Sequence, residues 1–176
     1  MFALPTSIVT TRLSLKPISM DYKQQIYEEF TPEITTYTYP APAKKIEDTE
    51  KFIEGSMKEN EEGSNFQIVV IDKKTEEFLG CAGLHNIDTE TPELGIWLKK
   101  SAHGHGYGKE AITALKEWAE ENLDYEYILY PVAEQNIPSR TIPGSLGGKV
   151  EDEYDETNMS GVELHMLEYR IYPDGK

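Results

Sequence analysis

Residues 99–111, with the sequence KKSAHGHGYGKEA, form a basic and glycine-rich segment in a strongly acidic chain. The three glycines stand at alternate positions, and no acidic residue occurs before Glu110. The whole chain has 17 Lys and Arg against 32 Asp and Glu, a formal net charge of -15. Glycines at a helix start leave backbone N–H groups without a side-chain cap, and such groups bind anions. We therefore expect this segment to bind a phosphate-bearing ligand.

Other sites that contain histidine or glycine fit the segment less well. His103 and His105 are two residues apart, but two histidines are too few ligands for a metal ion, so we expect no metal site. A P-loop requires Ser or Thr after its Gly-Lys pair, whereas Glu110 follows Lys109 here. A dinucleotide fingerprint has the spacing G-x-G-x-x-G, and this segment has G-x-G-x-G. A flexible, solubilising loop remains the alternative.

Hydrophobic periodicity predicts strands and helices on both sides of this segment. Three expected strands between residues 65 and 99 are joined by short polar turns, which favours an antiparallel meander. The proline-rich residues 31–43 are expected to form a loop, and Asp48 is expected to cap the helix after it. Strands are predicted at residues 10–18, 65–72, 78–87, 93–99, 125–133, 148–154 and 162–172, and helices at 19–30, 48–60, 109–123 and 136–146.

The glycine-rich segment and its surroundings resemble motif A of the GNAT acetyltransferases. HGHGYGKEA follows ELGIWLKKSA here, where the family has Q/R-x-x-G-x-G/A and holds the pyrophosphate of acetyl-CoA on backbone amides. TTRLSLKPI, EFLGCAGLHNID and NIPSRTIPGSLGGK look most like the RimJ/RimL branch, so the resemblance extends from about Thr10 to Tyr172. It implies a mixed α/β (α+β) fold: a mostly antiparallel, seven-stranded sheet, flanked by helices, whose fourth and fifth strands splay apart.

The same resemblance implies which residues bind acetyl-CoA, the expected cosubstrate. Main-chain groups of Ile96, Trp97 and Leu98 would bind the pantetheine and the thioester, and the side chain of Asn136 would bind the pantetheine arm. His103 occupies the position where the family has Gln or Arg. The residues expected to hold the pyrophosphate are His103, Gly104, His105, Gly106, Tyr107, Gly108 and Lys109.

The expected catalytic residues depart from the family pattern at one position. Pro143 stands seven residues after Asn136, where many members have the tyrosine that protonates the leaving thiolate. Ser139 is the nearest hydroxyl and is the candidate for that role. Glu93 and His85 are the candidate bases that deprotonate the amine. Their alternative roles are a strand-end surface carboxylate and a buried core histidine.

Composition and charge narrow the class of protein. A chain of 176 residues that is 38% hydrophobic suits one domain, which we expect to cover residues 1–176. No apolar run reaches the length of about eighteen residues that spans a membrane, and the acidic balance argues against nucleic acid. Cys81, the single cysteine, is expected to be buried, which with the lack of an internal disulfide favours the cytoplasm. The acidic residues 151–156 are expected to be solvated surface.

The resemblance to the GNAT family therefore implies an N-acetyltransferase that acts on a protein or peptide N-terminal α-amine, or on a small amine. The amine is expected to attack the thioester directly, because Cys81 lies off the catalytic positions. Both a monomer and a homodimer are compatible with the sequence. One alternative is a GNAT-fold module that binds acyl-CoA without turnover, and another is an interaction protein that presents its acidic surface to a basic partner.

Overall fold

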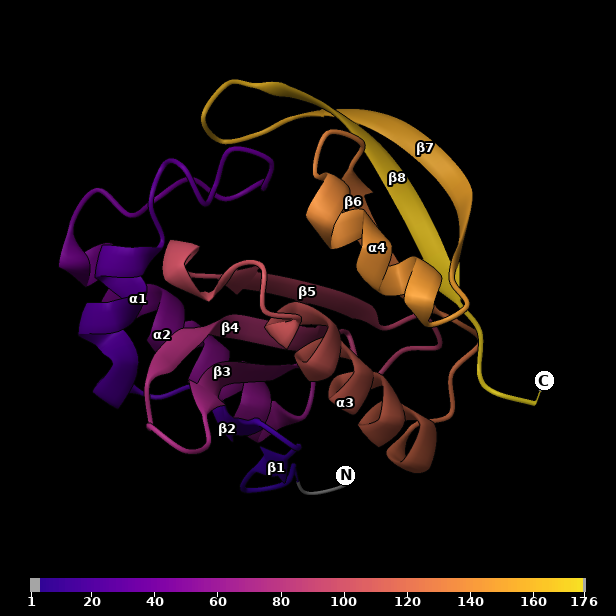
Figure 1. Ribbon diagram of the computed structural model, residues 1–176, viewed down its shortest axis with the longest axis horizontal. Helices are drawn as coiled ribbons and strands as arrows, with labels where there is room; N and C mark the ends of the chain where they lie inside the picture. Colours follow the sequence, from indigo (N-terminus) through magenta and orange to yellow (C-terminus); the bar gives the residue numbers. More distant parts are fainter. Residues whose placement is uncertain (1–3, 176) are drawn as a thin grey trace.

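An eight-stranded sheet forms the centre of the molecule (Figure 1). The computed structural model describes residues 4–175. The strand order is β1-β2-β3-β4-β5-β6-β8-β7, and every neighbouring pair is antiparallel except β5 with β6. The strands are β1 (Ile8–Val9), β2 (Leu13–Pro17), β3 (Phe66–Asp72), β4 (Phe78–His85), β5 (Glu93–Leu98), β6 (Ile128–Ala133), β7 (Lys149–Thr157) and β8 (Glu163–Ile171).

The helices lie in two layers, one on each face of this sheet (Figure 1). On one face, Ile26 and Ile53 of the first two α-helices pack against Val69 of β3. On the other face, Ile112 of α3 packs in one cluster with Ile68 of β3. The helices are η1 (Met20–Tyr22), α1 (Lys23–Glu29), α2 (Ile46–Glu62), η2 (Lys100–Ala102), α3 (Tyr107–Asn122) and α4 (Ile137–Ser145). The predicted mixed α/β class is therefore confirmed.

Two details differ from the sequence-based expectation. The sheet has one strand more than seven, because the two-residue β1 pairs with β2 at the N-terminal edge. Asp48 does not cap α2: the helix begins at Ile46 after Lys45, which makes no side-chain cap. Asp48 lies instead in the first helical turn, where its negative charge interacts favourably with the positive end of the helix dipole and stabilises the helix.

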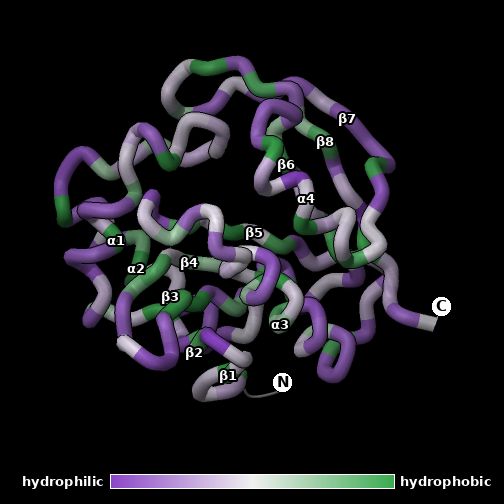
Figure 2. The backbone as a smooth tube through the Cα atoms, in the orientation of Figure 1, coloured by the Kyte–Doolittle hydropathy of each residue, from purple (hydrophilic) through white to green (hydrophobic). Residues whose placement is uncertain are grey.

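Burial follows the pattern of hydropathy along the strands (Figure 2). β3 and β4 are buried over nearly their whole length and carry apolar residues, as strands covered on both faces do. β7 is the edge strand and is exposed and acidic through residues 151–155. Charged residues on an edge strand hinder pairing with another chain. The expectation that residues 151–156 form a largely solvated surface is confirmed.

Two segments that are far apart in sequence meet at one end of the sheet. The loop between α1 and α2 approaches the turn between β7 and β8 (Figure 1). The Met159 N–H donates to the carbonyl of Tyr39 at 2.9 Å, and Asn158 Nδ2 donates to the carbonyl of Thr38 at 3.1 Å. These two hydrogen bonds join the loop to the turn. No helix within residues 4–175 has both the length and the apolar composition needed to cross a membrane.

Candidate active site

The glycine-rich segment forms the turn between η2 and α3. Gly104 and Gly106 have φ values of 77° and 76°, in the left-handed region that favours glycine. Gly106 is the N-cap of α3, and no side chain caps the helix there. Within the described part of the chain, the six backbone N–H groups of residues 104–109 donate to no acceptor. The start of α3 thus offers consecutive donors and a positive dipole end to an anion.

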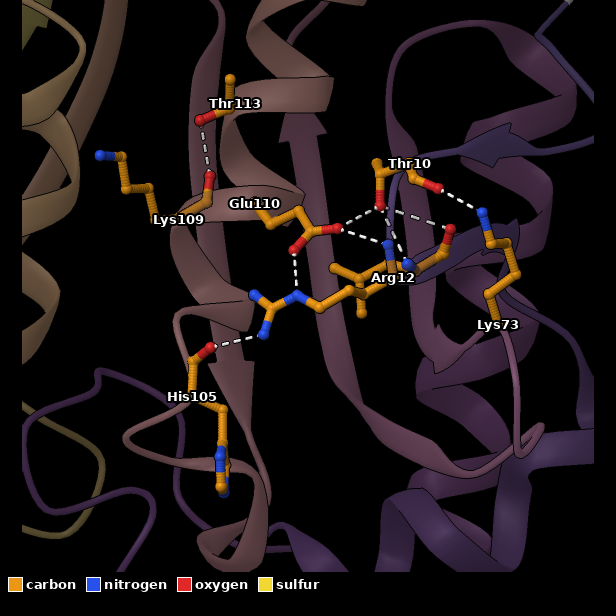
Figure 3. A network of polar contacts seen from close by, with 8 residues as sticks. Thr10, Arg12, Lys73, His105, Lys109, Glu110 and Thr113 are labelled. Atoms are coloured by element: carbon orange, nitrogen blue, oxygen red, sulfur yellow. Dashed lines mark hydrogen bonds and ion pairs between the residues drawn. The ribbon is translucent and has the colours of Figure 1, made fainter.

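A network of polar contacts anchors this turn to the N-terminal part of the chain (Figure 3). Arg12 donates from Nε to Glu110 Oε2 at 2.7 Å and from Nη1 to the carbonyl of His105 at 2.8 Å. Its guanidinium also lies 4.5 Å from the ring centroid of Tyr107. Thr10 Oγ1 donates to Glu110 Oε1 at 2.7 Å. One arginine thus contacts both the glycine turn and the first turn of α3.

The first turn of α3 contains one carboxylate, Glu110, whose charge is paired within this network. Burial would raise the pKa of Glu110, but the hydrogen bonds from Thr10 and Arg12 lower it below the ordinary value. The negative charge of Glu110 is thus matched by the Arg12 guanidinium, which the carboxylate faces (Figure 3). Sequence reasoning missed Arg12, although it lies in the quoted TTRLSLKPI segment.

The basic residues of the segment differ in their availability. Lys99 pairs with Glu77 at 2.6 Å and Lys100 pairs with Glu33 at 2.8 Å. Lys109 makes no ion pair with any carboxylate of residues 4–175, and its side chain extends away from Glu110 (Figure 3). Of the three lysines in the segment, Lys109 is therefore the one whose charge is not matched by a carboxylate of the described residues.

His103 has a structural contact instead of a free imidazole. Its Nε2 lies 2.8 Å from the carbonyl oxygen of Leu98, so a ring protonated at Nε2 donates to it. This contact connects the end of β5 to the start of the glycine turn. The side chain of His103 is thus engaged with β5, and its main-chain N–H donates to the carbonyl of Lys100 at 3.2 Å. Its part in pyrophosphate binding stays a prediction.

A gap opens between β5 and β6 next to this turn. The two strands are joined by a single bridge, Glu93 with Leu129, and then diverge (Figure 1). Beyond Glu93 the β6-facing edge of β5 has no strand partner in the described chain. The splayed pair that the family resemblance implies is therefore confirmed.

The register with β4 decides which main-chain groups enter the gap. The Lys99 N–H donates to the carbonyl of Leu79 at 2.8 Å, and hydrogen-bonded pairs alternate along an antiparallel ladder. The N–H and C=O groups of Ile96 and Leu98 consequently point towards β6, and those of Trp97 point towards β4. The expectation is corrected for Trp97, whose ring packs 4.8 Å from that of Phe30 on the α1 side.

Helix α4 closes the gap on the side of α3. A methyl group placed on Gly108 would lie 3.2 Å from Ile142 Cδ1 of α4 and 3.9 Å from Ile96 Cδ1 of β5. Asn136 is the N-cap of α4, and its side chain makes no capping hydrogen bond. Ser139 Oγ lies 2.8 Å from the hydroxyl of Tyr130 in β6. Glycine at position 108 thus allows α3, α4 and β5 to meet at the gap.

The two candidate bases lie on the opposite face of the sheet. His85 of β4 and Glu93 of β5 are direct cross-strand partners. Burial raises the pKa of Glu93, and the nearby carboxylates Glu168 and Glu156 raise it further. Burial lowers the pKa of His85, against an opposing effect of Glu59. Both groups are therefore shifted towards the neutral form.

The ring of His85 lies over Gly83 and Gly95, which have no side chains and leave space for it. A methyl group on Gly83 would lie 2.8 Å from His85 Nε2, and one on Gly95 would lie 3.8 Å from the same atom. Gly95 precedes Ile96, whose main chain points into the gap. His85 and Glu93 thus lie on the α1 and α2 face of β4 and β5, whereas Ser139 lies on α4, whose Ile142 packs in the cluster on the other face.

Comparison with known proteins agrees with this arrangement. Residues 12–149 match the family described as the acetyltransferase (GNAT) domain. The chain belongs to the GNAT acetyltransferase family. An uncharacterized N-acetyltransferase, p20 of Bacillus licheniformis, is 24% identical over 167 residues, which cover 92% of this chain and 94% of that protein. The expected family and enzyme class are thereby confirmed.

Two solved structures share the GNAT fold of this chain. RimL, a ribosomal L7/L12 alpha-N-protein acetyltransferase in complex with coenzyme A, has a TM-score of 0.84 at 16% identity and covers 96% of this chain and 98% of its own. The microcin C7 self-immunity acetyltransferase MccE, in complex with acetyl-CoA and AMP, has a TM-score of 0.83 at 20% identity and covers 96% of this chain and 97% of its own. Among residues 4–175 of this GNAT protein, no group of three or more His, Cys, Asp or Glu side chains is arranged to hold a metal ion.

Proposed function

We propose that this GNAT protein transfers the acetyl group of acetyl-CoA to a primary amine, either a protein or peptide N-terminal α-amine or a small amine. One observation carries the proposal: the unbonded amides of residues 104–109 lie at the same end of β5 as the open edge at Ile96 and Leu98. An anion-binding helix start beside an open strand edge suits a ligand with a pyrophosphate and an amide-containing arm.

In this proposal the substrate is held mainly by main-chain groups. The amides of residues 104–109 bind the pyrophosphate, and Lys109 adds an unmatched positive charge. The amide-containing pantetheine arm follows the edge of β5, where Ile96 and Leu98 offer main-chain groups. The Leu98 carbonyl accepts a hydrogen bond from His103. Of these two residues, Ile96 is therefore the one whose main-chain N–H and C=O are both available. The side chain of Asn136 contacts the arm from the start of α4.

The chemistry that we propose uses both faces of the sheet. The amine approaches from the α1 and α2 side, where Glu93 or His85 accepts its proton. An α-amine has an ordinary pKa of about 8, against about 10.4 for lysine, so it requires only modest assistance. The main-chain N–H of Ile96 donates to the oxyanion that forms on the thioester carbonyl. The thiolate then leaves towards α4.

We infer direct attack of the amine rather than an acyl-enzyme. Cys81 is 1% exposed and belongs to the core between β4 and the first two helices. Burial raises the pKa of its thiol, which keeps it in the unreactive protonated form. Its main chain pairs with Trp97 on the closed edge of β5. The thiol therefore lacks both the ionisation and the access that a nucleophile requires.

Two measurements test the proposal. Calorimetry with acetyl-CoA should show binding, and a thiol-release assay with peptides that begin with Ala, Ser, Met or Thr, together with polyamines and aminoglycosides, should find an acceptor. Binding without thiol release for any amine would favour the second candidate, an acyl-CoA-binding module, which the presence of Pro143 in α4 supports. Absence of acetyl-CoA binding would reject both functions.

A further inference from the structure

The buried hydroxyl of Tyr130 contacts Ser139, the residue expected to interact with the leaving thiolate. Its side chain is 2% exposed and belongs to the core cluster shared with α3. Its hydroxyl lies 2.8 Å from Ser139 Oγ, a hydrogen-bonding distance for two hydroxyl groups. Neither the catalytic positions of the family resemblance nor sequence periodicity singles out Tyr130.

The position of Ser139 on α4 directs it to the gap between β5 and β6. Ser139 lies three residues before Ile142, so the two side chains share one face of the helix. Ile142 contacts the start of α3 at Gly108, next to the side chains of Ile96 and Leu98. The same face of α4 therefore looks onto the open edge of β5, where the proposed function places the thioester.

The hydrogen bond between the two hydroxyls has a preferred direction. A phenol is a stronger acid than an aliphatic alcohol, so it is the better donor, and the serine oxygen is the better acceptor. With Tyr130 donating, the hydrogen of Ser139 is free to turn towards a third atom. Tyr130 lies in a β-strand of the core, and its hydroxyl is thus held in a fixed place.

We propose that Tyr130 is a positioning residue: its hydroxyl donates to Ser139 Oγ and so aims the Ser139 O–H at the sulfur of the leaving coenzyme A thiolate. This inference rests on the proposed function. It assigns to Ser139 and Tyr130 the interaction with the thiolate that Pro143, which has no hydroxyl, cannot make. When the carbon–sulfur bond breaks, its electron pair goes to sulfur, and the Ser139 O–H stabilises that charge by a hydrogen bond.

No proton passes from the protein to the sulfur in this step. A thiol has an ordinary pKa of about 8.5, and it is therefore a stronger acid than a serine hydroxyl. Burial raises the pKa of Tyr130 to about 12, so its phenol is also a weaker acid than the coenzyme A thiol. The thiolate consequently leaves as an anion and takes its proton from solvent. The pair Tyr130 and Ser139 acts as an oriented dipole.

A double-mutant cycle separates this role from a structural one. Tyr130→Phe should lower kcat about tenfold, the effect of losing one well-placed hydrogen bond, and leave the KM for acetyl-CoA unchanged. In the Ser139→Ala background the same change should have no further effect on kcat. Tyr125→Phe is the matched control, because Tyr125 is 4% exposed and its hydroxyl donates to Glu120 of α3 at 2.6 Å rather than to a residue of α4. Equal losses of kcat in both backgrounds would overturn the proposal.

A spectroscopic readout does not depend on turnover. Thiolate absorbance of bound coenzyme A, followed against pH, should show a thiol pKa below the free value of about 8.5. Tyr130→Phe and Ser139→Ala should each return it to the free value, and Tyr125→Phe should not. An unchanged thiol pKa in Tyr130→Phe would overturn the role of Tyr130. Absence of turnover in the wild-type protein, with the pKa lowered as expected, would instead reject the proposed acetyl transfer alone.

Discussion

The Arg12 guanidinium and the Glu110 carboxylate form an ion pair at 2.7 Å that joins the start of β2 to the first turn of α3. The same guanidinium donates to the carbonyl of His105 inside the glycine turn. One side chain thus holds a helix start and the turn that precedes it. A binding loop that is already ordered loses less entropy when its ligand binds.

Replacing Arg12 should therefore weaken binding of coenzyme A without removing any direct ligand. We expect Arg12→Ala to raise the dissociation constant about tenfold, because the turn must then be ordered on binding. Isothermal titration calorimetry measures this change, and the loss should be mainly entropic. Lys23→Ala is the control, since it breaks the pair of Lys23 with Glu50 at 2.7 Å. Equal affinities of the two variants would contradict the role of Arg12.

Gly104 offers a test of the turn geometry itself. Its φ is 77°, and a methyl group there would meet no atom within 4 Å, so alanine has only a backbone cost of about 1 to 2 kcal/mol. Gly161, at φ 82° with equally open space, has the same cost. Both Gly→Ala variants should lose similar stability in urea unfolding, but only Gly104→Ala should lose affinity for coenzyme A. Parallel losses of affinity would show that the turn is not the binding site.

The lysines of the segment should differ in their contribution to binding. Lys109→Ala should weaken the affinity for coenzyme A several-fold, because its charge is not matched by a carboxylate. Lys100→Ala should have little effect, since Lys100 pairs with Glu33 at 2.8 Å. The difference between the two variants should shrink at high salt, where exposed charges are screened. Fluorescence or calorimetric titration at two ionic strengths measures it.

Glu93 links activity and stability through one pKa. Because burial and two neighbouring carboxylates raise this pKa in the folded protein, ionisation of Glu93 destabilises the fold as the pH rises through it. We expect Glu93→Gln to be more stable than the wild type near neutral pH. The gain should disappear below the ordinary carboxylate pKa of about 4.3, where the wild-type group is protonated. Urea unfolding at the two pH values measures this.

The same substitution tests the proposed base. Glu93→Gln should lower kcat/KM on the order of tenfold to a hundredfold and remove the acidic limb of its pH profile. Glu90→Gln is the control, because Glu90 is exposed in the turn before β5. If Glu93→Gln retains full activity, His85 is the base, and His85→Gln should then show the loss.

Cys81 should be inert in the folded enzyme. A thiol reagent such as N-ethylmaleimide should neither label Cys81 nor inhibit acetyl transfer under native conditions, because the side chain is 1% exposed. Labelling should become complete in urea. Rapid native labelling with loss of activity would contradict direct attack by the amine.

Local features of the sequence were sufficient to predict the backbone geometry of the glycine turn in the candidate site. The glycines at residues 104 and 106 indicate left-handed backbone, and their place before an amphipathic helix indicates uncapped amides. The left-handed backbone and the uncapped amides both depend only on residues that are close together in the sequence. The buried Cys81 and, apart from the short β1, the order of strands and α-helices were also predicted correctly, since alternation of apolar residues is a local signal.

Contacts between distant residues were decided by the tertiary structure alone. Arg12 meets Glu110 across 98 positions of sequence, and Tyr130 meets Ser139 only because α4 folds back onto β6. The direction of the main-chain groups of Trp97 follows from the register of β5 on β4, and a shift of one residue would reverse it. Local residue types determine which groups can bind or react, whereas packing between elements determines which of them face the same space.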